Sequence, residues 1–224
     1  PIWHPEIEDI LVLKNNKGTE DNRVRRMDYS IQISKLFYER FMNEGDITLI
    51  SPHQAPGLYE AFGTEAFDDL YLKYEADKTI PKKTVPAQDL FGDLLKERAE
   101  TGRIYIMNLD HCNSHSSFKD KVSMSNLCQE ITLPTTPIQD LHDEQGEIAL
   151  CILSAVNVGG LNDLSELENI CDLSVRALEQ IIDYQDYPVK AAEISTKARR
   201  SLGIGYIGLA HYLAKNGVKY SDPK

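Results

Sequence analysis

The fold class follows from Pro86-Ala-Gln-Asp-Leu-Phe-Gly-Asp-Leu-Leu-Lys-Glu-Arg-Ala-Glu-Thr101 and the adjoining segment Arg103-Ile-Tyr-Ile-Met-Asn108. The longer stretch carries apolar residues at the spacing of one helix face, which predicts an amphipathic helix. The shorter segment is apolar and follows Gly102, which predicts a strand. A helix followed closely by a strand is typical of α/β proteins. The apolar positions of the predicted helix face are Leu90, Phe91, Leu94 and Leu95.

The alternation of helices and strands continues on both sides of this stretch. Because strands interspersed with helices predict an α/β architecture, we expect that fold class for the whole chain. No stretch has the composition of a linker, so we interpret residues 1–224 as part of one domain. The further predicted helices are 5–13, 33–42, 57–62, 67–74, 164–184, 188–199 and 204–215, and the further predicted strands are 27–33, 47–50, 126–133 and 147–153.

Composition excludes several classes of protein. The formal net charge of −11 argues against general nucleic-acid binding, because an acidic chain repels phosphates. No apolar stretch of about 18 residues is present, so we expect no membrane span. The N-terminus lacks the features of a signal peptide, and the four cysteines do not form a secreted disulfide framework. We therefore expect a cytoplasmic protein, and we interpret both ends as cut from a longer chain.

The run Ser125-Asn126-Leu127-Cys128-Gln129-Glu130 places an amide, a thiol and a carboxylate at alternating positions. In a strand these three side chains would share one side, about 6.5 Å apart. That spacing suits a sugar-sized substrate. The alternative is a half-buried strand with an unreactive core cysteine. A second cysteine, Cys151, follows in a predicted strand, and the polar stretch 108–125 is predicted to be a loop that delivers a reactive residue.

Three other motifs are open to two interpretations each. The run 203–208 matches Gly-x-Gly-x-x-Gly, but it lacks a preceding buried strand, so a helix start is favoured over a dinucleotide site. His111, Cys112 and His115 resemble metal ligands, yet a zinc site needs about four ligands, so hydrogen-bonded loop residues are favoured. The arginines at 23, 25 and 26 could bind phosphate or pair with carboxylates. Cys171 is predicted to be packing within a helix.

The chain resembles the large, catalytic subunit of class I ribonucleotide reductase. The resemblance runs nearly end to end, with the cysteines in the expected order. The segments that carry it are Leu11–Asn16, Arg23–Tyr29, Thr101–Ile106, Asp110–Asn113, Asn126–Glu130, Gly146–Cys151, Asp183–Pro188 and Leu202–Gly205.

The resemblance implies a fold and a set of site residues. The family fold is a ten-stranded α/β barrel built from two half-barrels, with a loop inside the barrel that carries a radical-forming cysteine. Cys128 matches that thiyl-radical cysteine, and Asn126 and Glu130 match the substrate-binding amide and the catalytic carboxylate. Cys151 matches one member of the redox-active cysteine pair, whose partner is expected upstream of Pro1.

The resemblance also implies partners and cofactors. We expect a ribonucleoside diphosphate substrate, a metal-containing small subunit that supplies the radical, self-association of large subunits, and thioredoxin or glutaredoxin as reductant. No metal and no directly bound cofactor is expected in this chain, and the nucleotide effectors (ATP and dNTPs) belong to the complete subunit. Residues 1–224 would be a central piece of the barrel, without the N-terminal nucleotide-sensing domain and the C-terminal part of the barrel. The alternative is a non-catalytic nucleotide-binding or assembly piece of a split subunit.

Overall fold

The computed structural model describes residues 1–222, apart from the side chain of Asn22. The chain forms two compact units, Pro1–Pro134 and Thr135–Lys224. Each unit contains strands and helices, and the strands pair in both parallel and antiparallel fashion. The predicted α/β class is therefore confirmed.

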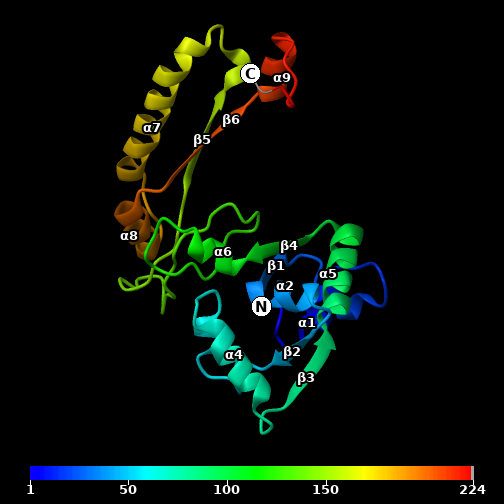
Figure 1. The fold of residues 1–224 in the computed structure, drawn as a ribbon. Coiled ribbons are helices and arrows are strands. Elements are labelled where there is room, and N and C mark those ends of the chain that lie inside the picture. The colour runs from blue at the N-terminus through cyan, green and yellow to red at the C-terminus, as the bar shows by residue number, and fades with distance from the viewer. Residues whose placement is uncertain (223–224) are drawn as a thin grey trace. The chain divides into compact units, whose positions relative to one another are not determined.

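The centre of the first unit is a parallel pair of strands, β1 (Tyr29–Ile33) and β4 (Ile104–Asn108), which lie side by side in Figure 1. The register runs from Tyr29 opposite Ile104 to Ile33 opposite Asn108. Both strands therefore end at the same edge of the pair. Ile33 and Ile104 are fully buried, because their β-branched side chains fill the core on the pleated surface.

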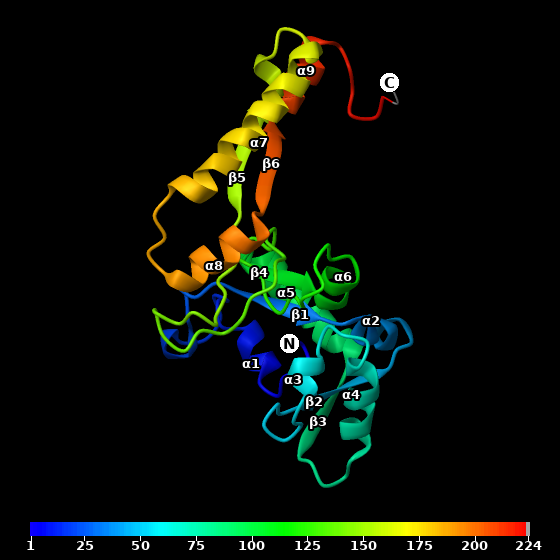
Figure 2. The same cartoon turned by 90° about the vertical axis from the view of Figure 1, so that its left-hand side faces the viewer.

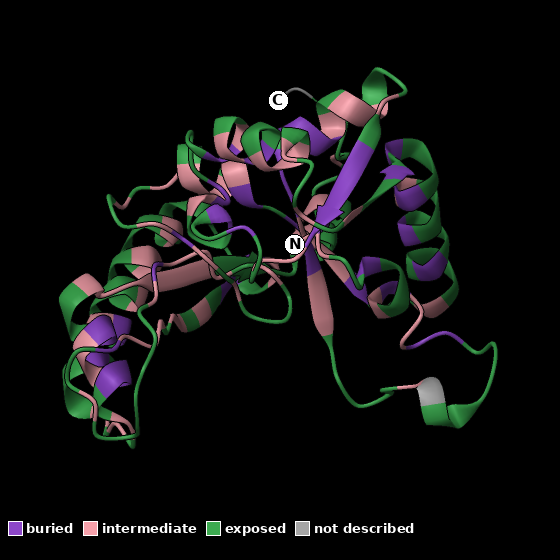
Figure 3. Cartoon of the chain, turned by 90° about the horizontal axis from the view of Figure 1, so that it is seen from below, coloured by how far each residue is buried: buried purple, intermediate pink, exposed green. Residues whose placement is uncertain are grey.

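The predicted amphipathic helix is present as α5 (Ala87–Thr101). Leu90 and Leu94 are buried at helical spacing, and Figure 3 shows buried and exposed bands alternating along the helices. The helix ends at Gly102, whose φ of +65° lets its N–H donate to the Arg98 carbonyl at 2.7 Å. The glycine thus turns the chain from α5 directly into β4.

A second sheet supports the same core. Strand β2 (Asp46–Ile50) pairs antiparallel with β3 (Lys82–Pro86), a strand that the sequence pattern did not predict. The Tyr71 hydroxyl accepts a hydrogen bond from the Thr48 amide and donates one to the Thr48 carbonyl, which joins α4 (Phe67–Ala76) to β2. The remaining elements of this unit are α1 (Ile7–Leu11), η1 (Glu20–Asn22), α2 (Lys35–Met42), α3 (Leu58–Ala61), α4 (Phe67–Ala76) and α6 (Leu109–Ser114).

The second unit is built on a parallel pair, β5 (Ile152–Asn157) and β6 (Leu202–Ile207). The long helix α7 (Leu167–Tyr184) packs along both strands, as Figures 1 and 2 show. Its buried residues Leu178 and Ile182 lie at helical spacing. The other elements of this unit are η2 (Val158–Gly160), η3 (Leu164–Glu166), α8 (Lys190–Arg199) and α9 (Leu209–Lys215).

The predicted strand over residues 126–133 is wrong. These residues form a turn and irregular backbone, and Gln129 has a φ of +67°, which no strand residue adopts. The side chains of Ser125 and Asn126 bind the backbone at Ile131, so local hydrogen bonds replace strand pairing.

Two other predicted elements need correction. The predicted strand over 147–153 begins too early, because β5 starts at Ile152 and Ile148 bonds instead to the Ala191 carbonyl. The predicted helix over 204–215 is split into β6 and the short helix α9. Gly203 and Gly205 lie inside β6, and only Gly208, the N-cap of α9, stands at a helix start. The first two glycines therefore do not form the strand-to-helix turn of a dinucleotide site.

Leu94 and its neighbour Leu95 offer a test of the core. Leu94 is fully buried and Leu95 is 46% exposed. Leu94→Ala should lower the free energy of unfolding by about 2–5 kcal/mol, because it leaves a cavity. Leu95→Ala should change it by less than about 1 kcal/mol. Urea unfolding followed by the fluorescence of Trp3, the single tryptophan, measures both, and equal losses would contradict the assigned packing.

Candidate active-site loop

The candidate site starts from the edge where β1 and β4 both end. The chain leaves β1 at Ser34, which caps α2, and leaves β4 at Asn108, which precedes α6. Asp110 in the first turn of α6 accepts a hydrogen bond from the Lys35 amide at 2.6 Å, so the two helix starts are joined. In parallel α/β sheets this carboxyl edge is where ligands usually bind.

The loop that follows α6 is fixed to the unit by side-chain amides. The Asn113 amide nitrogen donates to the Val122 carbonyl at 3.0 Å, and its oxygen accepts from the Val122 amide at 2.8 Å. The Gln32 side chain, on β1, donates to the Ser123 carbonyl at 2.7 Å. Val122 is fully buried. The loop therefore has a rigid attachment a few residues before Cys128.

Residues 125–131 close into a compact turn with Cys128 near its tip. The Asn126 side-chain oxygen accepts from the Ile131 amide at 2.9 Å, and the Ser125 hydroxyl donates to the Ile131 carbonyl at 2.7 Å. The Gln129 amide donates to the Asn126 carbonyl at 3.2 Å. Cys128 is exposed within this turn. The thiol is thus presented to solvent by a short loop whose two ends are bonded to each other.

The three predicted site residues of this loop are brought together, but not as predicted. Asn126, Cys128 and Glu130 are all exposed and share one turn. They do not line one side of an extended strand, because the Asn126 amide oxygen is used to close the turn. The core-cysteine alternative for Cys128 also fails, since its side chain is not buried.

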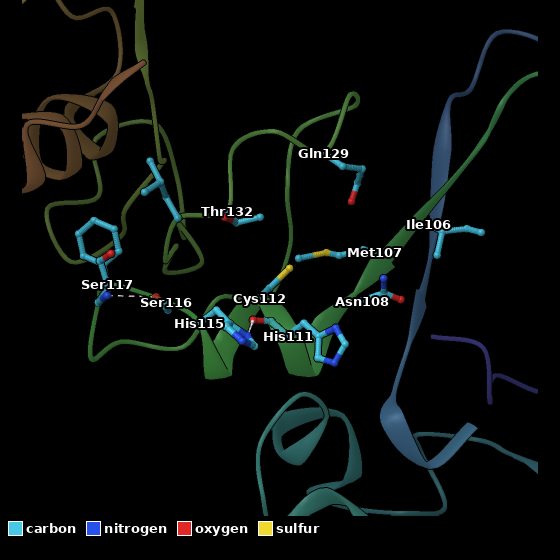
Figure 4. Close-up of a pocket in the computed structure, with 12 residues that line it drawn as sticks. Ile106, Met107, Asn108, His111, Cys112, His115, Ser116, Ser117, Gln129 and Thr132 are labelled. Carbon is cyan, nitrogen blue, oxygen red and sulfur yellow. Dashed lines mark hydrogen bonds between the residues drawn. The ribbon is translucent and has the colours of Figure 1, made fainter. Parts of the chain in front are cut away.

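A cavity of about 620 Å³ adjoins the loop within the first unit (Figure 4). Residues of β4, α6 and the loop line it together. Within residues 1–222, the Gln129 side-chain oxygen is buried there without a hydrogen-bond partner. Its lining includes Met107 and Asn108 from β4, His111 and Cys112 from α6, and Gln129 and Thr132 from the loop.

Two ionisable groups near this edge have shifted pKa values. Burial raises the pKa of the Cys112 thiol, so this cysteine resists ionisation. Burial, followed by the nearby Asp110 carboxylate, raises the pKa of Asp68. Asp68 and Asp110 both line a second cavity of about 610 Å³, together with Lys35 and Lys121. The edge is therefore polar and carries charges of both signs.

The other motifs of the sequence form neither a metal cluster nor a cluster of unpaired arginines within the described residues. His111 and Cys112 lie in α6 rather than in a loop, and no group of three metal-type ligands occurs in the part of the chain that is described. Arg25 pairs with Glu20 at 2.5 Å, which supports the carboxylate-paired interpretation of the arginine cluster. Cys171 packs against a small cluster in the second unit, as predicted.

Cys151 belongs to the second unit and precedes β5 directly. It is half-buried, and its Sγ lies close to Gly203 of β6. None of the four cysteines forms a disulfide within the described residues.

Sequence patterns did not identify the residues that hold the loop. Asn113 and Gln32 are polar side chains within or beside regular elements, and both bond to loop backbone. The sequence offered only the amide side chains themselves, Gln32 in a predicted strand and Asn113 in a segment predicted to be a loop. Side-chain amides can take the place of a paired strand, because they carry both a donor and an acceptor.

Comparison with known proteins places the chain in a family. The family model for the ribonucleotide reductase barrel domain matches residues 1–224. The ribonucleoside-diphosphate reductase subunit alpha of Haemophilus influenzae is 60% identical over 99% of this chain. The ribonucleoside-diphosphate reductase 1 subunit alpha of Escherichia coli K12 is 56% identical over 99% of the chain, and the ribonucleoside-diphosphate reductase subunit alpha of Enterobacteria phage T4 is 43% identical over 99%.

The chain spans about 30% of the length of each of these relatives. Within residues 1–222, no helix has both the length and the apolar character needed to span a bilayer. The match over the full chain, the α/β architecture and the cysteine-bearing loop agree: this chain belongs to the ribonucleotide reductase family, as part of its barrel domain.

Proposed function

We propose that this chain carries the radical cysteine and one reducing cysteine of an enzyme that converts ribonucleoside diphosphates to 2′-deoxyribonucleoside diphosphates. The observation that carries the proposal is the exposed Cys128 thiol at the tip of a closed turn, flanked by Asn126 and Glu130. A radical cysteine must be both reachable by substrate and held in place. The bonded turn meets both needs.

The chemistry accounts for each residue type. A thiyl radical on Cys128 takes the hydrogen atom from C3′ of the ribose, and Glu130 accepts the proton of the 3′ hydroxyl and returns it to the 3′ oxygen at the end of the cycle. The 2′ hydroxyl leaves as water. Cys151 and a second thiol supply two electrons and two protons and become a disulfide, and Cys128 returns the hydrogen atom to C3′. Asn126 donates hydrogen bonds to the ribose hydroxyls through the amide nitrogen that the turn does not use.

The proposed partners follow from this chemistry. A metal-containing small subunit supplies the radical, and thioredoxin or glutaredoxin reduces the disulfide after each turnover. Large subunits associate with each other, and ATP and dNTPs act as effectors. The relatives are named alpha subunits, which supports the proposal that a second kind of subunit takes part. They are also named ribonucleoside-diphosphate reductases, which supports a diphosphate substrate.

Replacing Cys128 tests the function. In the full-length subunit with its radical-supplying partner, Cys128→Ser should abolish deoxynucleotide formation, because the O–H bond is too strong for a hydrogen-atom relay. Nucleotide binding should persist, since the two side chains are similar in size. Cys171→Ser, in α7, is the matched control and should keep turnover. Wild-type turnover in Cys128→Ser would refute the proposal and favour a binding or assembly role without chemistry.

Replacing Glu130 tests the general base. Glu130→Gln keeps the shape of the side chain but cannot accept a proton. We expect turnover to fall about 10²–10⁴-fold, the usual effect of removing a positioned acid–base group, with nucleotide affinity nearly unchanged. Steady-state rates at saturating substrate and equilibrium binding separate the two effects. A variant that binds weakly but turns over normally at saturation would contradict the assigned role.

The oxidation state of Cys151 tests the reducing role. In the full-length subunit Cys151 should be a thiol under reductant and should become a disulfide after one turnover without external reductant. Mass spectrometry of peptides alkylated before and after that turnover measures the change. If Cys151 remains fully alkylatable once product has formed, it is not the reductant.

A further inference from the structure

Two backbone hydrogen bonds hold the chain on either side of Cys151. The Ile148 amide donates to the Ala191 carbonyl at 3.2 Å, and the Ile152 amide donates to the Ser201 carbonyl at 3.3 Å. Both acceptors belong to the segment 191–203, which runs through α8 into β6. Cys151 therefore lies on a short span that this one segment supports at both ends.

An ion pair strengthens the support on the N-terminal side. The two guanidinium nitrogens of Arg199 donate to the two carboxylate oxygens of Glu147, each at 2.8 Å. The side chains are only 12% and 21% exposed, so water weakens this pair less than a surface pair. Two parallel bonds also fix orientation, which a lysine could not do. The ion pair therefore fixes the position of Glu147 relative to helix α8.

The corner between α8 and β6 is held as well. Arg200 has a φ of +49°, an uncommon value for a residue with a side chain. Its guanidinium pairs with Glu179 and with Asp183, both on α7. The strained corner is therefore supported from the long helix, and β6 starts from a defined position.

Gly203 lies directly against the Cys151 sulfur. A Cβ atom placed on Gly203 would stand 3.1 Å from Cys151 Sγ and 2.5 Å from the Cδ2 atom of Leu153. Leu153 is 60% exposed, so its side chain can swing away. The sulfur would also have to shift by a few tenths of an ångström. Only glycine leaves room for the thiol in its present position.

We propose that Gly203 and the Glu147–Arg199 ion pair are positioning residues for Cys151, which they hold where its sulfur can be oxidised. The inference rests on the proposed reducing role of Cys151. Disulfide formation needs the two Cβ atoms about 3.5–4.5 Å apart, so a displaced sulfur meets its partner less often. A misplacement of about 1 Å in a reacting group can cost on the order of 10²-fold in rate.

Gly205 provides a matched control for Gly203. Both glycines lie in β6, two positions apart on the same side of the strand. Gly203 is opposite Leu153 and Gly205 is opposite Ala155 in the neighbouring strand β5. No heavy atom of the described residues comes within 4 Å of a Cβ built on Gly205. Gly203→Ala and Gly205→Ala lower the conformational entropy of the unfolded chain by the same amount, because each replaces one glycine by alanine. Only Gly203→Ala disturbs the cysteine.

The experiment is a single turnover of the full-length subunit without external reductant, with rapid quenching and alkylation. The rate at which Cys151 becomes disulfide should fall about 10-fold or more in Gly203→Ala, on the scale set by misplaced reacting groups. It should stay within about twofold in Gly205→Ala. Substrate affinity should be unchanged in both. Equal rates in the two variants would overturn the role of Gly203.

Arg199 gives an independent measurement if Gly203→Ala fails to fold. Arg199→Met should slow Cys151 oxidation about 10-fold, and Arg199→Lys should recover little, because it cannot make both bonds. Lys197→Met, which removes an exposed pair with Glu193 on the same helix, is the control and should oxidise at the wild-type rate. If Cys151 is oxidised at the same rate in Arg199→Met and in Lys197→Met, the proposed role of the ion pair is wrong.

Cys151→Ser separates failure of the inference from failure of the proposed function. If Cys151→Ser forms product at the wild-type rate, the reducing role itself is wrong. If Cys151→Ser is inactive while the Gly203 and Arg199 variants oxidise normally, only the positioning inference is wrong.

Discussion

The parallel pairing of β1 with β4 is the interaction on which the rest of the first unit depends. Parallel neighbours cannot be joined by a tight turn, so the chain between Ile33 and Ile104 must travel away and return. It uses that excursion to build the β2–β3 pair and α5. Because the pair is in register, both strands end together, and the chain starts a helix from each end. The site loop departs from the second of these helices.

The position of the loop that carries Cys128 depends on the pairing of β1 with β4. Asn113 on α6 and Gln32 on β1 reach the loop backbone from two elements of the core. Each of these bonds satisfies a backbone carbonyl group of the loop, which a neighbouring strand would otherwise do. The loop needs no sheet of its own, and its tip remains exposed. A reactive side chain on such a loop is reachable and yet fixed, as rigid scaffolds commonly arrange.

Sequence patterns predicted the elements that depend on local periodicity. The spacing of Leu90 and Leu94 predicts α5, and the short apolar segment after Gly102 predicts β4. They failed where side-chain hydrogen bonds to the backbone decide the local structure. The alternation at Asn126, Cys128 and Glu130 has the period of a strand, but Asn126 bonds its own turn instead.

The second unit shows the same limit. β6 contains glycines that disfavour a strand locally, and its pairing with β5 overrides that preference. The spacing of Asn126, Cys128 and Glu130 marked them as candidates, but their proposed roles came from resemblance to a family, because no pattern distinguishes a reactive cysteine from a packed one. The contacts around Cys151 could not be read from sequence, since Glu147 and Arg199 are far apart along the chain.

The two cysteines are held by different physical means, and the difference suits their proposed chemistry. Cys128 sits on a turn closed by neutral hydrogen bonds to backbone, and nothing in radical transfer requires that turn to change partners. In the proposed cycle Cys151 exchanges a thiol for a disulfide and back, and such an exchange needs room beside the sulfur. A glycine provides room without a polar group that oxidation would disturb, while the Glu147–Arg199 pair holds the backbone from a distance. Support through the backbone, rather than through the sulfur, lets one site serve both oxidation states.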